Sequence, residues 1–136
     1  MAKTARWAYV PPYEQVRKQL GFDSRDRMTA EVTVEQMQSA LRLLLPAVSV
    51  DEPWYRRTYP DVAEAIDAGS FKSAQDHFVQ NGWFEGRHPY EIEVDEDWYL
   101  ATYDDVAEGV ETGEILSAAE HFQHHGYQEG RLPREP

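Results

Sequence analysis

The chain of 136 residues carries 25 acidic against 13 basic side chains, a formal net charge of −12 at pH 7. An acidic surface repels phosphate backbones and anionic membranes, so neither nucleic acid nor a membrane is an expected partner. The absence of cysteine excludes disulfides, thiolate metal sites and a cysteine nucleophile. The longest apolar stretch, 41–48, is too short to span a membrane, and the first residues lack the apolar segment of a secretory signal. These features predict a cytoplasmic protein that packing stabilises.

The charge is divided unevenly along the chain. Residues 1–49 hold seven basic and five acidic side chains, a balance of +2, whereas residues 50–136 hold six basic and twenty acidic ones, a balance of −14. Because this shift lies beside Pro46, we expect an organisational boundary near Ser49. A balance of +2 is weak for a segment that would bind nucleic acid by counterion release, so we do not expect that activity.

The first residues form an aromatic and proline-rich segment. Residues 6–13 read Arg-Trp-Ala-Tyr-Val-Pro-Pro-Tyr, and a residue that precedes proline is steered away from the helical conformation. We therefore expect an extended N-terminal arm that lies on another surface. Its candidate partner-binding residues are Arg6, Trp7, Tyr9 and Tyr13.

Two helices are predicted between this arm and the boundary. Pro12 and Gly21 bracket a helix over 13–20, because proline suits the first helical position and glycine the position after the last. A capping box that begins at Thr33 starts a second helix, which Pro46 stops.

An internal repeat occupies the rest of the chain. Residues 50–69 align without a gap on residues 94–113, an offset of 44, and identities continue to Pro89 and Pro133. Such self-similarity is typical of stacked supersecondary units. We therefore expect three parts, which are the arm with its two helices over 1–49, repeat 1 over 50–93 and repeat 2 over 94–136.

Each repeat is predicted to be a small helical unit. Asp51 and its counterpart Asp95 are suited to cap a first helix, which Pro60 should break in repeat 1. Ser73 and Ser117 are suited to cap a third helix. No segment alternates apolar and polar residues over a useful length, as a half-buried strand would. The expected fold is therefore all-α, with two tandem short-helix repeats.

Aromatic and aliphatic side chains recur in the repeats at three- to four-residue spacing, so they share one helical face that should form the core. The third helix of repeat 1 is expected to turn His77, Phe78 and Trp83 inward. Gly82 and Gly126 are predicted to supply the C-terminal caps of the third helices. The residues that we expect to build the repeats are Trp54, Tyr55, His77, Gly82, Glu85 and Arg87, with their counterparts Trp98, Tyr99, His121, Gly126, Glu129 and Arg131.

This pattern resembles a tandem helical repeat of bacterial proteins, which occurs beside glycosyltransferase domains and in large surface or calcium-binding proteins. The resemblance covers residues 50–134 and implies a helical accessory or interaction module without a catalytic residue. Repeat 1 departs from it at Arg56, where the family prefers leucine. In repeat 2 the match is carried by Tyr99-Leu100, Asp105-Val106-Ala107, Gly113, Ser117-Ala118, His121-Phe122, Gly126, Glu129-Gly130-Arg131 and Pro133.

Three histidines form a candidate metal site. His121, His124 and His125 stand at i, i+3 and i+4, a spacing that puts three imidazoles on one side of a helix. Only His121 has a histidine twin in repeat 1, since the other two align with Gln80 and Asn81. We favour the interpretation in which His121 and its twin are hydrogen-bonded core residues, and we expect no metal or other cofactor.

The Glu-Gly-Arg triplets at 85–87 and 129–131 admit two interpretations. Each guanidinium fork could bind a carboxylate or phosphate ligand. Alternatively, an acid and a base beside a helix-ending glycine would lock the last turn by an ion pair. Their repetition at identical spacing favours the structural role.

The sequence contains none of the common catalytic motifs, so we do not expect an enzyme. The leading hypothesis is a non-catalytic protein-interaction module, an adaptor, accessory subunit or regulator. Its acidic repeats would meet a basic partner, and the aromatic arm would be a second contact. Two repeats are fewer than a free-standing array needs, which favours association with another molecule, a second copy of this chain included, or a capping role for residues 32–46.

Two alternatives remain. An acidic nucleic-acid mimic would block a DNA-binding protein. A glycan-binding or polysaccharide-biosynthesis accessory protein would stack sugars on rings that the core also needs, namely Trp54, Tyr55, Trp83, Trp98, Tyr99 and Tyr127.

Overall fold

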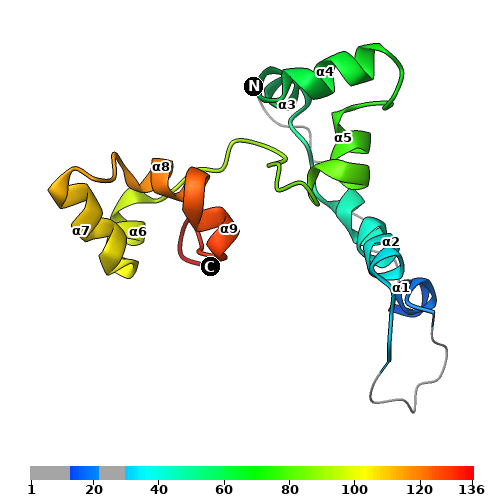
Figure 1. The fold of residues 1–136 in the computed structure, drawn as a ribbon, viewed down its shortest axis with the longest axis horizontal. Helices are drawn as coiled ribbons and strands as arrows, with labels where there is room; N and C mark the ends of the chain where they lie inside the picture. The colour runs from blue at the N-terminus through cyan, green and yellow to red at the C-terminus, as the bar shows by residue number, and fades with distance from the viewer. Residues whose placement is uncertain (1–12, 22–29) are drawn as a thin grey trace. The chain divides into compact units, whose positions relative to one another are not determined.

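A computed structural model describes residues 13–21 and 30–136, and in these ranges the regular elements are helices without a strand. The all-α prediction is confirmed. The chain divides into two compact units, Met1–Tyr90 and Glu91–Pro136, whose helices are labelled in Figure 1. Within the described ranges, none of the helices combines the length and the apolar character needed to cross a membrane.

The first unit begins with the two helices that the sequence predicts. Helix α1 spans Tyr13–Gln19 and packs against α2, Val34–Leu44. Thr33 and Gln36 make the reciprocal capping box at the start of α2. A 3₁₀ turn, η1 (Leu45–Ala47), takes up Pro46 and ends the helical segment.

Repeat 1 supplies α3 (Glu52–Thr58), α4 (Pro60–Asp67), α5 (Ala74–His77) and the π-helical turn η2 (Phe78–Gly82). Asp51 and Ser73 cap α3 and α5 as predicted, because each side chain accepts a hydrogen bond from a backbone N–H of the first turn. The helical conformation is interrupted between α3 and α4 at Tyr59, directly before Pro60.

The second unit repeats this order with α6 (Glu96–Thr102), α7 (Asp104–Thr112), α8 (Ala118–His121), η3 (Phe122–Gly126) and a last turn, α9 (Tyr127–Glu129). Asp95 and Ser117 are the N-caps. The break at Tyr103 occurs without a proline, since Asp104 starts α7 at the position that Pro60 holds in repeat 1.

The predicted role of Gly82 and Gly126 as the C-terminal caps of the third helices is wrong, because the caps are Trp83 and Tyr127. Both glycines are the last residues of the π-helical turns and have right-handed backbone; turns follow over 83–86 in repeat 1, and α9 follows in repeat 2. The left-handed glycines that follow are Gly86, with φ of 80°, and Gly130, with φ of 79°. The wider π turn was not visible in the pattern of apolar residues, which is the same for a helix that ends and for one that widens.

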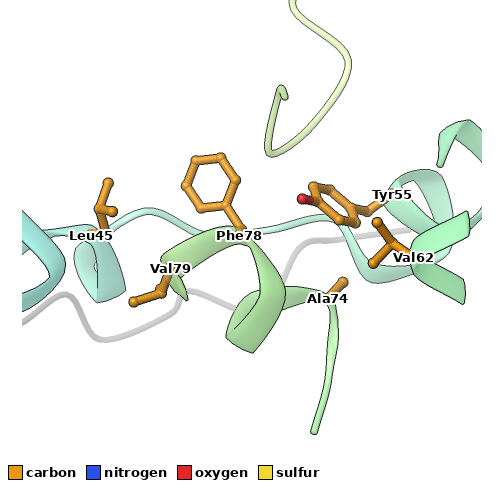
Figure 2. Packing of buried hydrophobic residues seen from close by; sticks show 6 residues of the cluster. All are labelled: Leu45, Tyr55, Val62, Ala74, Phe78 and Val79. Atoms are coloured by element: carbon orange, nitrogen blue, oxygen red, sulfur yellow. The ribbon is translucent and has the colours of Figure 1, made fainter. Parts of the chain in front are cut away.

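The core of the first unit joins α2 and η1 to repeat 1. Figure 2 shows Leu45 and Val79 on one side of Phe78, with the remaining core side chains on its other side. Arg42 of α2 donates two hydrogen bonds to the Gln80 carbonyl, and its guanidinium lies 4.8 Å from the centre of the Phe84 ring. The segment that contains α2 therefore covers one end of repeat 1. The buried residues of this core are Leu45, Tyr55, Val62, Ala74, Phe78 and Val79.

Four of these core residues have buried counterparts in repeat 2. The counterparts of Tyr55, Val62, Ala74 and Phe78 are Tyr99, Val106, Ala118 and Phe122. The prediction that Trp83 points into the core is wrong, because 38% of its surface is exposed. It lies beyond the π turn, which rotates the chain relative to a continuous α-helix.

Candidate functional site

A buried tyrosine and a buried histidine meet at the centre of each repeat. The Tyr55 hydroxyl on α3 lies 2.8 Å from Nδ1 of His77 on α5, and the Tyr99 hydroxyl lies 2.9 Å from Nδ1 of His121. Burial lowers the pKa of both imidazoles and raises the pKa of both phenols, so each pair is neutral at pH 7. The hydrogen bond satisfies two polar groups of buried side chains.

The side chains of Tyr55 and Tyr99 leave no room for a β-carbon at Gly82 and Gly126. A β-carbon at Gly82 would overlap the Tyr55 hydroxyl oxygen, and one at Gly126 would overlap that of Tyr99. Glycine is therefore required for the close approach of the ring, and not for a left-handed backbone.

Each Glu-Gly-Arg arginine is held by two carboxylates. Arg87 donates from Nη1 and Nη2 to the two Asp61 oxygens, at 3.0 and 2.8 Å, and from Nε to Glu85 at 2.8 Å. Its guanidinium lies 4.9 Å from the centre of the Tyr59 ring. The Glu85–Arg87 ion pair has the structural form that the sequence favours, but Asp61 on α4 was missed as a partner.

Repeat 2 reproduces this network closely. Arg131 reaches the two Asp105 oxygens at 2.8 and 2.7 Å and Glu129 at 2.7 Å, and it stacks on the Tyr103 ring at 4.8 Å. The hydrogen bonds from Arg131 lower the pKa of Asp105 to about 2. Because the protein's own carboxylates fill both guanidinium forks, these arginines are not open sites for an anionic ligand. The missed signal was the aspartate of Asp-Val-Ala, which recurs in both repeats.

A second missed contact joins the first and third helices of each repeat. The Glu52 carboxylate accepts a hydrogen bond from the Ala74 N–H at 2.8 Å. Glu96 accepts from the N–H groups of Ala118 and Ala119, both at 3.0 Å. These glutamates satisfy amide groups at the N-terminus of a neighbouring helix, which otherwise lack intrahelical partners.

The three histidines of repeat 2 border a pocket of about 150 Å³, lined by Glu114, Ile115, Glu120, His121, His124 and His125. His121 is buried, with 8% of its surface exposed, whereas His124 and His125 are exposed. The rings of His121 and His125 are 5.6 Å apart. Over residues 13–21 and 30–136, no three or more histidine, aspartate or glutamate side chains are grouped so that they could hold a metal ion.

The rings proposed for sugar stacking are mostly packed inside the repeats. Tyr55 and Tyr99 have no exposed surface. Trp54 and Trp98 are partly buried and make edge contacts with tyrosine rings at 6.0 and 6.1 Å, and Tyr127 packs against the second core. Of the proposed residues of the arm, Arg6, Trp7 and Tyr9 lie outside the described residues, and Tyr13 is the first residue of α1.

The two units use their carboxylates differently. The first unit holds eleven basic and twelve acidic side chains, a balance of −1, and the second holds two basic and thirteen acidic ones, a balance of −11. Within 50–90, the carboxylates that accept a hydrogen bond or form an ion pair are Asp51, Glu52, Asp61, Asp67, Asp76 and Glu85, so that only Glu64 has no described partner. Within the described second unit, the carboxylates without a partner are Glu91, Glu93, Asp97, Asp104, Glu108, Glu111, Glu114, Glu120 and Glu135.

Substitutions between the repeats explain this difference. Arg56, which pairs with Glu52 and Asp67 in the first unit, is replaced by Leu100, which packs on the second core. Lys72 is replaced by Leu116, of which 78% is exposed. Repeat 2 therefore keeps the core contacts of repeat 1 and lacks the cations at these two positions, and it also holds more carboxylates, thirteen over 91–136 against seven over 50–90.

Comparisons of the chain with protein-family models, with curated proteins and with solved structures find no match. The function proposed below therefore depends on the geometry and charge of the chain.

Proposed function

We propose that the protein is a non-catalytic protein-interaction module, an adaptor, accessory subunit or regulator, whose acidic second unit binds a basic partner protein in the cytoplasm. The observation that carries the proposal is the set of unpaired carboxylates on the second unit, where the net charge is −11. Clustered like charges oppose the compact state through mutual repulsion, and a basic partner removes that repulsion when it binds.

The use of the buried polar groups supports a binding role over catalysis. The groups whose pKa values are shifted most are Tyr55 of a tyrosine–histidine pair and Arg87, Asp105 and Arg131 of the arginine networks. Each of them is engaged by another part of its own repeat. Catalytic acids and bases are perturbed groups that face a substrate, and here the perturbed groups face one another.

The acidic surface is tested by capture of the partner with two matched variants. The second-unit triple variant carries Asp97→Asn, Glu108→Gln and Glu111→Gln, and the first-unit triple variant carries Glu31→Gln, Glu35→Gln and Glu64→Gln. All six side chains are exposed, and both variants lose the same charge. We expect proteins co-purified from the native cells to include a basic one that the second-unit triple variant loses and the first-unit triple variant retains. Equal retention by both variants would contradict the proposal.

The contribution of the arm is tested by deletion of residues 1–12. We expect the truncated chain to bind the captured partner more weakly while the circular dichroism and melting temperature of the repeats stay unchanged. Unfolding of the truncated chain would assign the arm to the core instead. Light scattering on the complex and on the free chain reports whether a second copy of this chain participates.

A further inference from the structure

The residues that line the pocket beside His121 differ in chemical type from their counterparts in repeat 1. The lining residues Glu114, Ile115, Glu120, His124 and His125 align with Ser70, Phe71, Asp76, Gln80 and Asn81 of repeat 1. With His77 and its counterpart His121 included, the first copy has one carboxylate and one imidazole, whereas the second has two carboxylates and three imidazoles. The four buried residues that the two cores share are of the same types, so the difference lies in the residues around the pocket.

Two coupled substitutions shape the pocket. In repeat 1 the Phe71 ring stands edge-on to the His77 ring at 4.7 Å, so an aromatic side chain covers that histidine. In repeat 2 the smaller Ile115 lies against Gly109 of α7, where a β-carbon would overlap its side chain. Ile115 therefore leans toward α7 and leaves space beside His121. Since about 10–15 Å³ of such volume holds one water molecule, a pocket of about 150 Å³ has room for a side-chain head group.

The lining of the pocket suits a planar cation. Glu114 and Glu120 carry two negative charges and have no hydrogen-bond or ion-pair partner among the described side chains. The Tyr99 hydroxyl occupies Nδ1 of His121, which holds that ring in place. An arginine guanidinium pairs with carboxylates through a rigid fork and stacks on flat rings, whereas a lysine ammonium does not stack in this way. Leu116, which follows Ile115 in the chain, adds an exposed apolar side chain beside these charges.

We propose that this pocket receives an arginine side chain of the basic partner, with Leu116 contacting an apolar residue next to that arginine. The proposal rests on the proposed function and gives its acidic surface a specific contact point. The ligand that we propose is a protein side chain and not a metal ion, because the described residues offer no grouping of three metal ligands.

The test is a nuclear magnetic resonance titration of the ¹⁵N-labelled full chain with an acetylated and amidated peptide that contains two Arg-Leu pairs. A peptide with citrulline in place of arginine keeps the shape of the arginine side chain without its positive charge. A peptide with lysine keeps the positive charge without the guanidinium fork. The protein variants are Glu114→Gln with Glu120→Gln in the pocket, and Glu108→Gln with Glu111→Gln as a control of equal charge on the same unit. Leu116→Ala reports the apolar contact and alters an exposed side chain, so it leaves the fold intact.

We expect the arginine peptide to shift the amide signals of 114–125 and to leave the equivalent positions 70–81 unchanged. The pocket variant should bind about tenfold more weakly, which corresponds to about 1.4 kcal/mol, and the control variant should bind as the wild type does. The citrulline peptide should cause no shifts, and the lysine peptide should bind more weakly than the arginine peptide.

Two results would overturn the pocket assignment while the proposed function stands. One is equal weakening by the pocket and control variants, which would mean diffuse attraction to the whole second unit. The other is a response of the pocket signals to Zn²⁺ with none to the arginine peptide, which would make it a metal site. Failure of every basic peptide to bind any part of the second unit would instead remove both the pocket assignment and the proposed function.

Discussion

The Tyr99 hydroxyl lies 2.9 Å from Nδ1 of His121, and 44 residues earlier Tyr55 and His77 make the same contact at 2.8 Å. All four residues are buried. The spacing between tyrosine and histidine, 22 residues in both copies, therefore corresponds to a hydrogen bond that ties the first helix of each repeat to the third.

Replacing Tyr99→Phe should remove this bond and leave a ring nitrogen of His121 unsatisfied. We expect the unfolding free energy of the second unit to fall by about 1–3 kcal/mol, the cost of an unpaired buried polar group. Amide hydrogen exchange measures each unit separately, so protection in the first unit should not change. Tyr55→Phe should give the converse pattern. A loss spread equally over both units would contradict this account.

Gly82→Ala should destabilise the first unit, because the new β-carbon overlaps the Tyr55 hydroxyl oxygen. We expect a loss of about 1–3 kcal/mol, as for other overpacked cores. Addition of Tyr55→Phe to this variant removes the overlapping atom, so the double variant should be more stable than the sum of the two single changes predicts. Urea denaturation of the four proteins tests this, and strict additivity would show that the glycine is needed for another reason.

Arg131→Lys should weaken the network of the second unit, because lysine cannot donate to both Asp105 oxygens and to Glu129 at once. Since Asp105 is largely exposed, we expect a loss of only about 1 kcal/mol, and a smaller one at high salt. Arg134→Lys is the matched control, because Arg134 is exposed and forms no ion pair with the described residues. Equal effects of the two changes would argue against the network.

The stability should decrease in two steps as the pH falls. Burial lowers the pKa of His77, His88 and His121 in the folded state, so below about pH 6.5 the unfolded chain binds more protons and the unfolding free energy decreases. Hydrogen bonds from arginine lower the pKa of Asp61 and Asp105, and their contribution is lost below about pH 4. Urea denaturation at successive pH values measures both steps.

The first of these steps is assigned by comparison of two variants. His121→Gln should flatten the dependence of stability on pH between 7 and 5, whatever its effect on stability at pH 7. His124→Gln removes an exposed histidine three residues away and is the control for loss of an imidazole. An unchanged slope in the His121 variant would contradict the role of burial.

The sequence alone predicts the elements of this fold well and its long-range contacts poorly. Asp51, Thr33 and Ser73 were identified as caps because a capping side chain acts on amides two or three residues away. Asp61 was missed as the partner of Arg87 because the two are 26 residues apart, and only folding brings them together. Glu52 was missed for the same reason, since its acceptor role lies on another helix.

The predictions for Gly82 and Trp83 were wrong because the same local sequence pattern is compatible with two different structures. A glycine after an apolar face fits a left-handed cap, but it fits equally a close approach by a distant tyrosine. The π turn then rotates Trp83 out of the face on which regular helical spacing places it. For the pocket, the composition of the histidine cluster was visible in the sequence, but the space beside it depends on how Ile115 packs against Gly109.

The central claim is that binding resides on the second unit, and fluorescence anisotropy of the labelled basic partner that the chain captures, titrated with the two triple variants, tests it most directly. We predict that the second-unit triple variant binds this partner about tenfold more weakly than the wild type, since three charge contacts contribute roughly 0.5 kcal/mol each. The first-unit triple variant, with the same loss of charge, should bind as the wild type does. Equal weakening by both variants would contradict the claim, because net charge alone would then account for the binding.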